Sequence, residues 1–360
     1  MNENELLIGF IEEFTPEDIV NPLMSRSGGQ PSWLGPKVPP NNCPNCRYPL
    51  TFILQLDCPL EYEYSVHRVE YLFYCKKCNT FHCLRNQLPE GTEYDDEDFV
   101  ESIVKDPCCH LCGFPSHKTT LKEGGESEPR CKSCGILYCN ANHLLANNKE
   151  HTMIRKELGN KSYCQLYKEW KEMNGNKEAT YEDFVNPENE FFRFIINNGG
   201  IREEAKERMN ASQYIIGMYD ENEVEDDEKE HIEQVMKKMK PDNDDIGIQN
   251  QKEIMEIDDY WLKFNLKMSK GQSQVLRYHF GGKPLWIHSK GIPQDIPCCP
   301  RCKKQCVFEW QLCPQFVYQT NLDIELNIDF GVVVVFACPD SCGGDDYVWE
   351  NVYVQENVAE

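Results

Sequence analysis

Apolar and β-branched residues gather in segments near both ends of the chain. Residues 51–56 and 69–74 are rich in β-branched and aromatic side chains, which predicts two strands. Apolar side chains alternate with polar ones between residues 321 and 330, and residues 332–336 form one continuous apolar run. Alternation is typical of a half-exposed strand, whereas the continuous run predicts a strand that is buried on both faces.

Helical periodicity and an acidic run occupy the region between these strand-rich ends. Residues 201–216 show some helical periodicity, and residues 220–230 are strongly acidic, which is typical of a solvated linker. Further along, apolar residues recur at helical spacing at Ile254, Ile257, Trp261, Phe264 and Met268. This spacing predicts an amphipathic helix that packs on the C-terminal strands.

Close cysteine pairs stand beside the predicted strands in both halves. The pairs are Cys43 with Cys46 and Cys75 with Cys78 in the first half, and Cys299 with Cys302 and Cys338 with Cys342 in the second. Two such pairs can supply four thiolates at about 2.3 Å from one zinc ion. We therefore predict one structural Zn²⁺ ion in each half, with no spare coordination position.

The two halves also match each other in sequence. A gap-free shift of 256 residues gives six identities in the fourteen positions from Cys43 to Leu56. The motif Gly-Gly-x-Pro-x-Trp precedes the first cysteine pair in both halves, and we expect its Trp33 to be a packing anchor. An internal duplication is predicted. The expected fold is α+β, with two zinc-stapled antiparallel β units of the same topology that pack face to face.

A third group of possible ligands lies between the halves: Cys109, Cys112, Cys131, Cys134, Cys139, His143 and His151. Interleaved pairs of this kind serve two zinc ions in a cross-braced module. One site would combine Cys109, Cys112, Cys139 and His143. The second would use Cys131, Cys134 and His151, and it needs a fourth ligand, for which Cys164, Cys108 and water are the alternatives. A weakened or empty structural site is favoured over a catalytic zinc, because no His-Glu-x-x-His motif accompanies it.

The remaining seven cysteines are expected to be buried as small apolar residues: Cys58, Cys83, Cys108, Cys164, Cys298, Cys306 and Cys313. The pattern as a whole divides the chain into four parts. These are a first zinc-stapled half (1–105), a small zinc finger (106–158), an acidic linker with helices (159–250) and a second zinc-stapled half (251–360).

Charge and cysteine content restrict the partners and the compartment. A net charge of −23 argues against generic binding to a nucleic-acid backbone and favours a basic protein partner. Twenty cysteines without a secretory signal indicate a reducing compartment. No apolar run approaches the ~20 residues of a membrane span, so no membrane association is expected. We expect the acidic residues at 220–230 to attract this basic protein partner towards a cleft between the two halves.

Several motifs together resemble the programmed cell death protein 2 family. They are Gly-Gly-x-Pro-x-Trp-Leu-Gly at 28–35, Leu-Arg-Asn-Gln-Leu at 84–88, Ser-Gln-Val-Leu-Arg-Tyr at 273–278 and Pro-Leu-Trp-Ile at 284–287, with Phe-Ala-Cys at 336–338. The middle cluster resembles the MYND-type zinc finger of one branch of that family. It departs from the MYND pattern in the long gap between Cys112 and Cys131, and in Arg155, which stands where the last Cys is expected.

The resemblance implies a dedicated chaperone that captures a newly made small-subunit ribosomal protein of the S-five family for ribosome biogenesis. A monomer that acts in the cytoplasm, and also in the nucleus, is expected, without direct nucleic-acid contact. The main alternative is an adaptor whose MYND-like finger docks Pro-containing peptides in transcriptional or cell-fate regulation. An enzyme, either a cross-braced ubiquitin ligase or a zinc hydrolase, is the least favoured interpretation, because no Gly-rich nucleotide loop or Gly-x-Ser-x-Gly elbow occurs.

Overall fold

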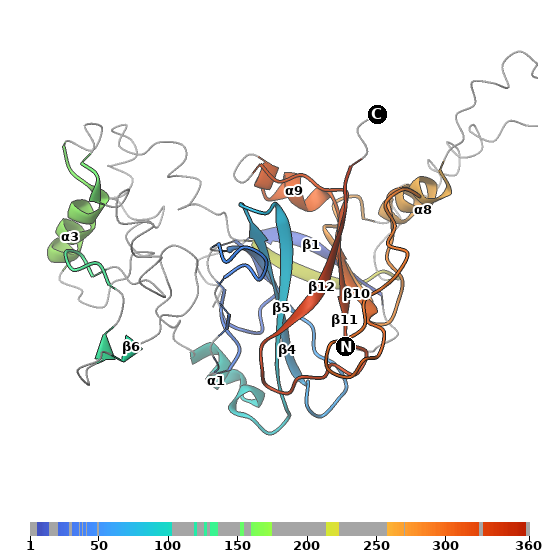
Figure 1. Cartoon of the computed structure of the whole chain (residues 1–360), viewed down its shortest axis with the longest axis horizontal. Coiled ribbons are helices and arrows are strands. Elements are labelled where there is room, and N and C mark those ends of the chain that lie inside the picture. Colours follow the sequence, from blue (N-terminus) through green and yellow to red (C-terminus); the bar gives the residue numbers. More distant parts are fainter. Residues whose placement is uncertain are drawn as a thin grey trace, which may run out of the picture.

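The architecture is a closed barrel of antiparallel strands, as seen in the computed structural model (Figure 1). The model describes residues 6–13, 21–28, 31–35, 37, 39–40, 42–48, 50–102, 119–120, 126–127, 130–135, 152–154, 160–174, 214–222, 258–269, 271–323 and 327–357. Within these residues, ten strands follow the order β1-β8-β2-β3-β4-β5-β12-β11-β10-β9, and β9 returns to β1. The described chain is mostly β, so the expected α+β fold of two separate packed units is corrected to one shared barrel.

Each half of the chain supplies four consecutive strands to the barrel. The first half supplies β2 (Arg26–Ser27), β3 (Thr51–Asp57), β4 (His67–Cys75) and β5 (Thr80–Leu88). The second half supplies β9 (Leu276–Tyr278), β10 (Val307–Leu312), β11 (Val332–Ala337) and β12 (Val348–Gln355). The strands predicted at 51–56, 69–74 and 332–336 are confirmed. Every residue of β11 is buried, as its continuous apolar sequence predicts.

Two further strands, β1 (Leu7–Glu13) and β8 (Tyr214–Asp220), join the halves on one side of the barrel. β8 was not expected, because residues 201–216 show helical periodicity and the acidic run begins at 220. It pairs with β1 over seven residues. Gly9 faces Met218 and Gly217 faces Phe10 in this ladder. A side chain at Gly9 would crowd Met218, and one at Gly217 would overlap the Glu12 carboxylate, so both positions require glycine for a reason that a periodicity argument cannot detect.

The alternating segment 321–330 forms no strand in its described residues. Asn321 and Asn327 adopt left-handed backbone angles, with φ of 56° and 53°, and these interrupt an extended conformation. The segment follows helix α9 (Gln315–Gln319) and turns apolar side chains inward. Ile328 and Phe330 are buried in the barrel core, where the Phe330 ring meets Phe81 edge-on at 5.6 Å. The alternating pattern therefore predicts the burial of Ile328 and Phe330 correctly, but it predicts a strand that the described residues do not form.

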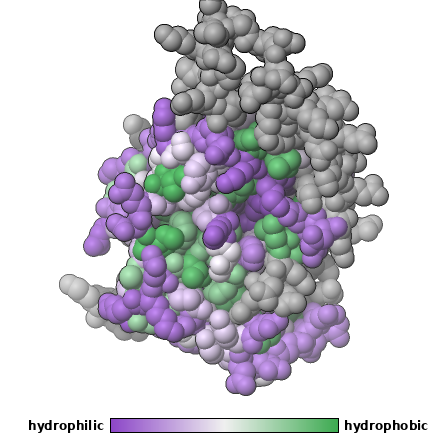
Figure 2. All heavy atoms as spheres, turned by 90° about the vertical axis from the view of Figure 1, so that its right-hand side faces the viewer, coloured by the Kyte–Doolittle hydropathy of each residue, from purple (hydrophilic) through white to green (hydrophobic). Residues whose placement is uncertain are grey.

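Helix α8 (Asp259–Met268) confirms the described part of the predicted amphipathic helix. Asp258 caps its N-terminus by accepting a hydrogen bond from the backbone of Tyr260, and Phe264 and Met268 are buried among residues of the second half. The helix lies on the side of the molecule that Figure 2 shows, where hydrophobic patches are scattered among hydrophilic ones. Among the described helices, none is long and apolar enough to cross a bilayer.

The other elements are small. They are η1 (Glu93–Asp95), α1 (Glu97–Ser102), α3 (Tyr163–Asn174) and the two-stranded sheet of β6 (Thr119–Thr120) and β7 (Glu126–Ser127). Helix α3 lies within the range expected to be the acidic linker, and so does strand β8. The four-part division of the chain itself remains a prediction.

Matching positions in the two halves have matching structural roles. β3 is irregular between Phe52 and Leu54, and β10 is irregular between Phe308 and Trp310, 256 residues later. Gln55 and Gln311 are both fully buried. Each side-chain oxygen accepts a hydrogen bond from the backbone N–H just before the motif tryptophan, from Ser32 at 2.9 Å and from Leu285 at 2.6 Å.

The repeated tryptophans pack on the outside of the barrel wall, as expected for anchors. Trp33 lies 4.7 Å from the Tyr71 ring, and Trp286 meets the Tyr353 ring edge-on at 5.7 Å. Each tryptophan belongs to a buried cluster that also contains cysteines of the nearby pairs. The barrel interior forms a third cluster, which draws apolar residues from both halves.

Candidate metal centres and their supports

The structure gathers the first four predicted ligands at one end of β4. Cys43 and Cys46 precede β3, Cys75 ends β4, and Cys78 lies in the turn to β5. Their four sulfur atoms lie within 4.8 Å of one another. The Sγ–Sγ distance is 3.5 Å between Cys46 and Cys75 and 4.0 Å between Cys43 and Cys78. These distances are far longer than a disulfide bond of about 2.05 Å, so the cluster is a set of free thiols.

The second cluster has the same form. Cys299, Cys302, Cys338 and Cys342 also place their sulfur atoms within 4.8 Å of one another. Cys299 lies 3.3 Å from Cys342, and Cys302 lies 3.5 Å from Cys338. Tetrahedral zinc with sulfur bonds of about 2.3 Å requires sulfur atoms about 3.8 Å apart. Both sets therefore fit one four-thiolate zinc site each.

A shared turn aims these thiols at a common centre. The backbone N–H four residues after the first cysteine donates to that cysteine's carbonyl, from Arg47 to Cys43, from Asn79 to Cys75 and from Lys303 to Cys299, at 2.8–3.0 Å. Arg47, Asn79 and Lys303 all have left-handed backbone angles, with φ between 53° and 64°. This conformation is costly for residues other than glycine. It recurs because it brings the two cysteines of a pair to the same side of the turn.

The middle group of cysteines is only partly described. Cys131 and Cys134 come together with Cys164, which stands in α3, and the Cys131 and Cys164 sulfur atoms are 3.7 Å apart. Gly135 closes the same type of turn, with φ of 82° and a hydrogen bond to the Cys131 carbonyl. Among the alternatives for a further ligand, the structure thus places Cys164 at the site. The other predicted ligands, Cys109, Cys112, Cys139, His143 and His151, lie outside the described residues.

Thiol ionisation in the four-cysteine clusters favours a cation. A hydrogen bond from Cys78 lowers the pKa of Cys46 to about 7, and the same interaction raises the pKa of Cys78 to about 12. Burial opposes ionisation of Cys299, but the backbone N–H groups of Cys302 and Arg301 outweigh it and lower its pKa to about 7. Cys46 and Cys299 are therefore partly ionised near neutral pH, and metal binding releases protons from the ligand thiols.

His82 supports the first cluster from outside the four thiols. Its Nε2 atom lies 3.3 Å from the Cys43 sulfur and 3.0 Å from the Thr80 hydroxyl. Burial lowers the pKa of His82, which keeps the ring neutral. A ring nitrogen beside a metal-binding thiolate orients that ligand. The structure therefore gives His82 a supporting position beside the four thiols.

The second cluster is attached to the first half of the chain by contacts that the sequence did not predict. Arg85 donates to the Cys342 carbonyl at 2.8 Å and pairs with Glu350 at 2.6 Å. Gln87 donates to the Ser341 carbonyl at 2.8 Å, and the Ser341 hydroxyl donates back to Gln87 at 2.7 Å. Arg85 and Gln87 belong to the motif Leu-Arg-Asn-Gln-Leu. These contacts satisfy two of the buried polar side chains of β5.

A buried ionic network also crosses the barrel interior. Arg68 forms a two-pronged pair with Glu309 of the opposite half, one contact of which is 2.8 Å, and it donates to Glu70 at 3.0 Å. All three side chains are fully buried. Trp310 donates its ring N–H to Glu70 at 2.5 Å. Burial, and then the nearby Glu309 carboxylate, raise the pKa of Glu70 well above its usual value, which favours the protonated carboxyl group in the folded state.

The cysteines outside the predicted clusters have different environments. Cys58, Cys83, Cys306 and Cys313 are buried, as expected for small apolar residues. Cys298 is exposed, so the expectation is wrong there, and Cys164 joins the middle cluster. Cys108 lies outside the described residues. Spacing alone does not distinguish these positions.

Comparisons with known proteins agree with this geometry. The family model for the N-terminal domain of programmed cell death protein 2 matches residues 5–101, and the one for its C-terminal putative domain matches residues 258–360. Programmed cell death protein 2 of Mus musculus is 30% identical over 353 residues, which cover 92% of this chain and 90% of the relative. The Rattus norvegicus protein of that name is 28% identical over 369 residues, 97% of this chain and 96% of the relative.

A shorter match involves a related protein. Programmed cell death protein 2-like of Gallus gallus is 36% identical over 100 residues, which cover 26% of this chain and 26% of the relative. No solved structure gives a significant match. Programmed cell death protein 2-like of Mus musculus, by contrast, is 21% identical over 335 residues, which cover 88% of this chain and 85% of the relative.

Proposed function

Because the chain belongs to the programmed cell death protein 2 family, we propose that it is a zinc-stabilised, non-enzymatic carrier for a newly made basic protein. The client is a small-subunit ribosomal protein of the S-five family, on its way to small-subunit assembly. The observation that carries the proposal is the net charge of −23 on a metal-stapled scaffold. A strongly acidic protein attracts a basic chain over long range and shields it from nucleic acid.

The buried polar groups support a scaffold role over catalysis. Arg68, Glu70 and Glu309 satisfy one another inside the barrel, and Arg85 pairs with Glu350 at the barrel seam. The Arg68–Glu309 and Arg85–Glu350 pairs join the two halves, and their side chains are shut away from solvent. The four-thiolate clusters leave no coordination position for a substrate, which is typical of structural zinc.

The fold of the carrier is, in this proposal, a duplicated unit. The equivalent strand irregularities, the equivalent glutamines and the shared cysteine turns support descent of both halves from one ancestor. Each half holds one zinc ion, and the MYND-like middle region holds at least one more. The protein acts as a monomer in the cytoplasm and in the nucleus, with neither nucleic acid nor membrane as a direct partner.

A second function is favoured by one specific observation. Cys131, Cys134 and Cys164 form a metal-binding group that lies outside the barrel strands. A MYND-like finger of this kind supports the alternative of an adaptor that docks Pro-containing peptides. Only the adaptor function requires the finger itself, and only the carrier function requires a basic client.

Affinity purification before and after a block of translation distinguishes the two. The tagged chain should recover one ribosomal protein of the S-five family far above all others, and the recovery should fall soon after translation stops. A Cys134→Ser variant is the matched control, because it damages the finger and spares both barrel clusters. If the variant loses all partners and the wild type recovers transcriptional regulators, the carrier function is wrong and the adaptor function is favoured.

A further inference from the structure

The seam between β5 and β12 is closed along only part of its length. Three residue pairs join the strands: Arg85 with Val348, Leu84 with Trp349 and Cys83 with Glu350. In the described structure the ladder ends there, although β5 reaches back to Thr80 and β12 continues to Gln355. The same register would next pair His82 with Asn351. The two strands are therefore paired at one end of the seam and unpaired at the other.

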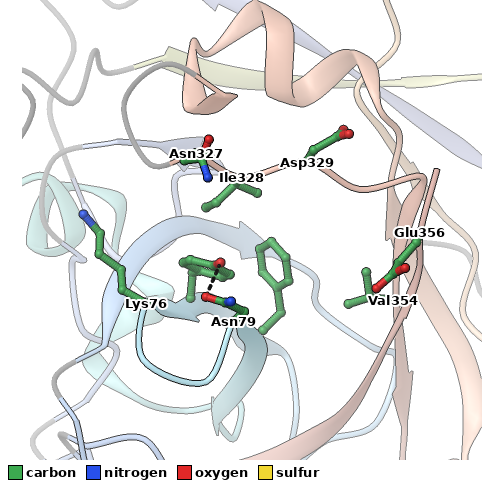
Figure 3. Close-up of a pocket in the computed structure, with 9 residues that line it drawn as sticks. Lys76, Asn79, Asn327, Ile328, Asp329, Val354 and Glu356 are labelled. Carbon is green, nitrogen blue, oxygen red and sulfur yellow. Dashed lines mark hydrogen bonds between the residues drawn. The ribbon is translucent and has the colours of Figure 1, made fainter. Parts of the chain in front are cut away.

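A pocket lies at the unpaired end of the β5–β12 seam (Figure 3). Its volume is about 420 Å³, and residues of both halves line it: Tyr74, Lys76, Asn79 and Phe81 from the first, and Asn327, Ile328, Asp329, Val354 and Glu356 from the second. In Figure 3, Val354 on β12 and Glu356 just after it lie across the gap from the turn that carries Lys76 and Asn79. The pocket is thus the space that the missing strand pairs leave open.

Resting on the carrier function proposed above, we propose that this open seam receives an extended basic segment of the client. The client backbone pairs with the free edge of β5 at 80–82 or of β12 at 351–355, and one of its basic side chains enters the pocket. Unpaired strand edges readily accept a further strand, and the backbone bonds then provide affinity while a side-chain pocket provides specificity.

The lining of the pocket suits the side chain of Lys or Arg. Asp329 and Glu356 are exposed carboxylates on the second-half side of the pocket, whereas Lys76 comes from the opposite half. The rings of Tyr74 and Phe81 lie 5.0 Å apart between them. Aliphatic stems of long basic side chains pack on such rings while the charged end reaches a carboxylate. A client with an acidic extension would meet repulsion at the same place.

Charge reversal at the pocket gives the direct test. Binding of the purified full chain to a small-subunit ribosomal protein of the S-five family is measured for the wild type and for Asp329→Lys/Glu356→Lys. We expect the double variant to bind about tenfold more weakly, a loss of about 1.4 kcal/mol. A second variant, Val354→Trp, fills the pocket without changing charge and should weaken binding to a similar extent. Glu97→Lys/Asp98→Lys is the control, because these exposed acids lie in α1.

Hydrogen–deuterium exchange of the complex adds a measurement that a general change in charge would not affect. Backbone amides at 80–82 and 351–355 should exchange more slowly when the client is bound. Thermal unfolding and zinc content check that each variant is folded. Failure of the wild type to bind the client overturns the carrier function, and the seam assignment with it. If the wild type binds and the pocket variants bind equally well, or if protection appears elsewhere, only the seam assignment is wrong.

Discussion

The two cysteine turns at 75–78 and 338–342 end equivalent strands, yet their surroundings differ. The turn at 338–342 is held against the first half by Arg85, Gln87 and the hydroxyl of Tyr64, which donates to the Asp340 carbonyl at 2.8 Å. The turn at 75–78 borders the open pocket instead. Similar local sequence thus produces a closed junction in one place and an accessible edge in the other. The first arrangement stabilises the barrel, and the second leaves open the pocket that we propose as the client site.

Loss of a zinc ligand should have the largest effect and should differ between the two turns. Cys302→Ser and Cys46→Ser should each remove one zinc, and a structural site contributes on the order of 10 kcal/mol in small zinc-binding peptides. Cys302→Ser should be the more damaging, because its cluster also supports the junction with the first half. Metal analysis and thermal unfolding measure both effects. Fewer than two zinc ions per wild-type chain would contradict the assignment of both clusters.

Removal of the junction arginine should come next. Arg85→Ala leaves the buried Glu350 carboxylate without its partner, and breaking a buried pair costs about 3–5 kcal/mol. Lys37→Ala is the matched control, because Lys37 pairs with Asp345 and Asp346 at the exposed surface, where such pairs contribute about 0–1 kcal/mol. Denaturant unfolding compares the two free energies. Equal losses would mean that the junction does not hold the barrel closed.

The interior network predicts a pH-dependent difference of smaller size. The raised pKa of Glu70 means that the folded state binds this proton more tightly than the unfolded state does, so the associated stability is complete below the ordinary Glu pKa and is lost as pH rises towards the folded value. Gln stays neutral, so Glu70→Gln should gain thermal stability relative to the wild type as pH rises from 5 to 8. Melting temperatures of both proteins across this range check the sign. A difference that stays constant or shrinks with rising pH would contradict the raised pKa of Glu70.

Electrostatic steering should produce the smallest effect. Asp220 ends β8 and Glu221 is buried against Arg277 at 2.6 Å, so these two acids belong to the barrel. Only the acids at 223–230, which lie outside the described residues, remain candidates for steering. Their replacement by Asn and Gln should slow client association severalfold, weaken its salt dependence and leave dissociation unchanged. Stopped-flow binding separates the two rates. A faster dissociation would place this run in the binding site.

Local chemistry made much of this protein predictable. The strand at 332–336, the helix ending at Met268 and both four-cysteine clusters follow from short-range patterns, because each depends on neighbours within a few residues or on a fixed turn. Prediction failed where a segment is decided by distant partners. β8 is a strand because β1 lies beside it, and Cys164 reaches Cys131 only through the packing of α3.

The sequence by itself determined the metal-binding turns, the repeated tryptophan and glutamine positions, and the acidic charge. Tertiary structure alone decided that the two halves share one barrel, with Arg68 of one half paired to Glu309 of the other. It also decided at which end of the seam β5 and β12 pair with each other. The physical reason is that strand pairing and buried ion pairs join residues more than two hundred positions apart, and no local pattern of apolar and polar residues specifies such partners.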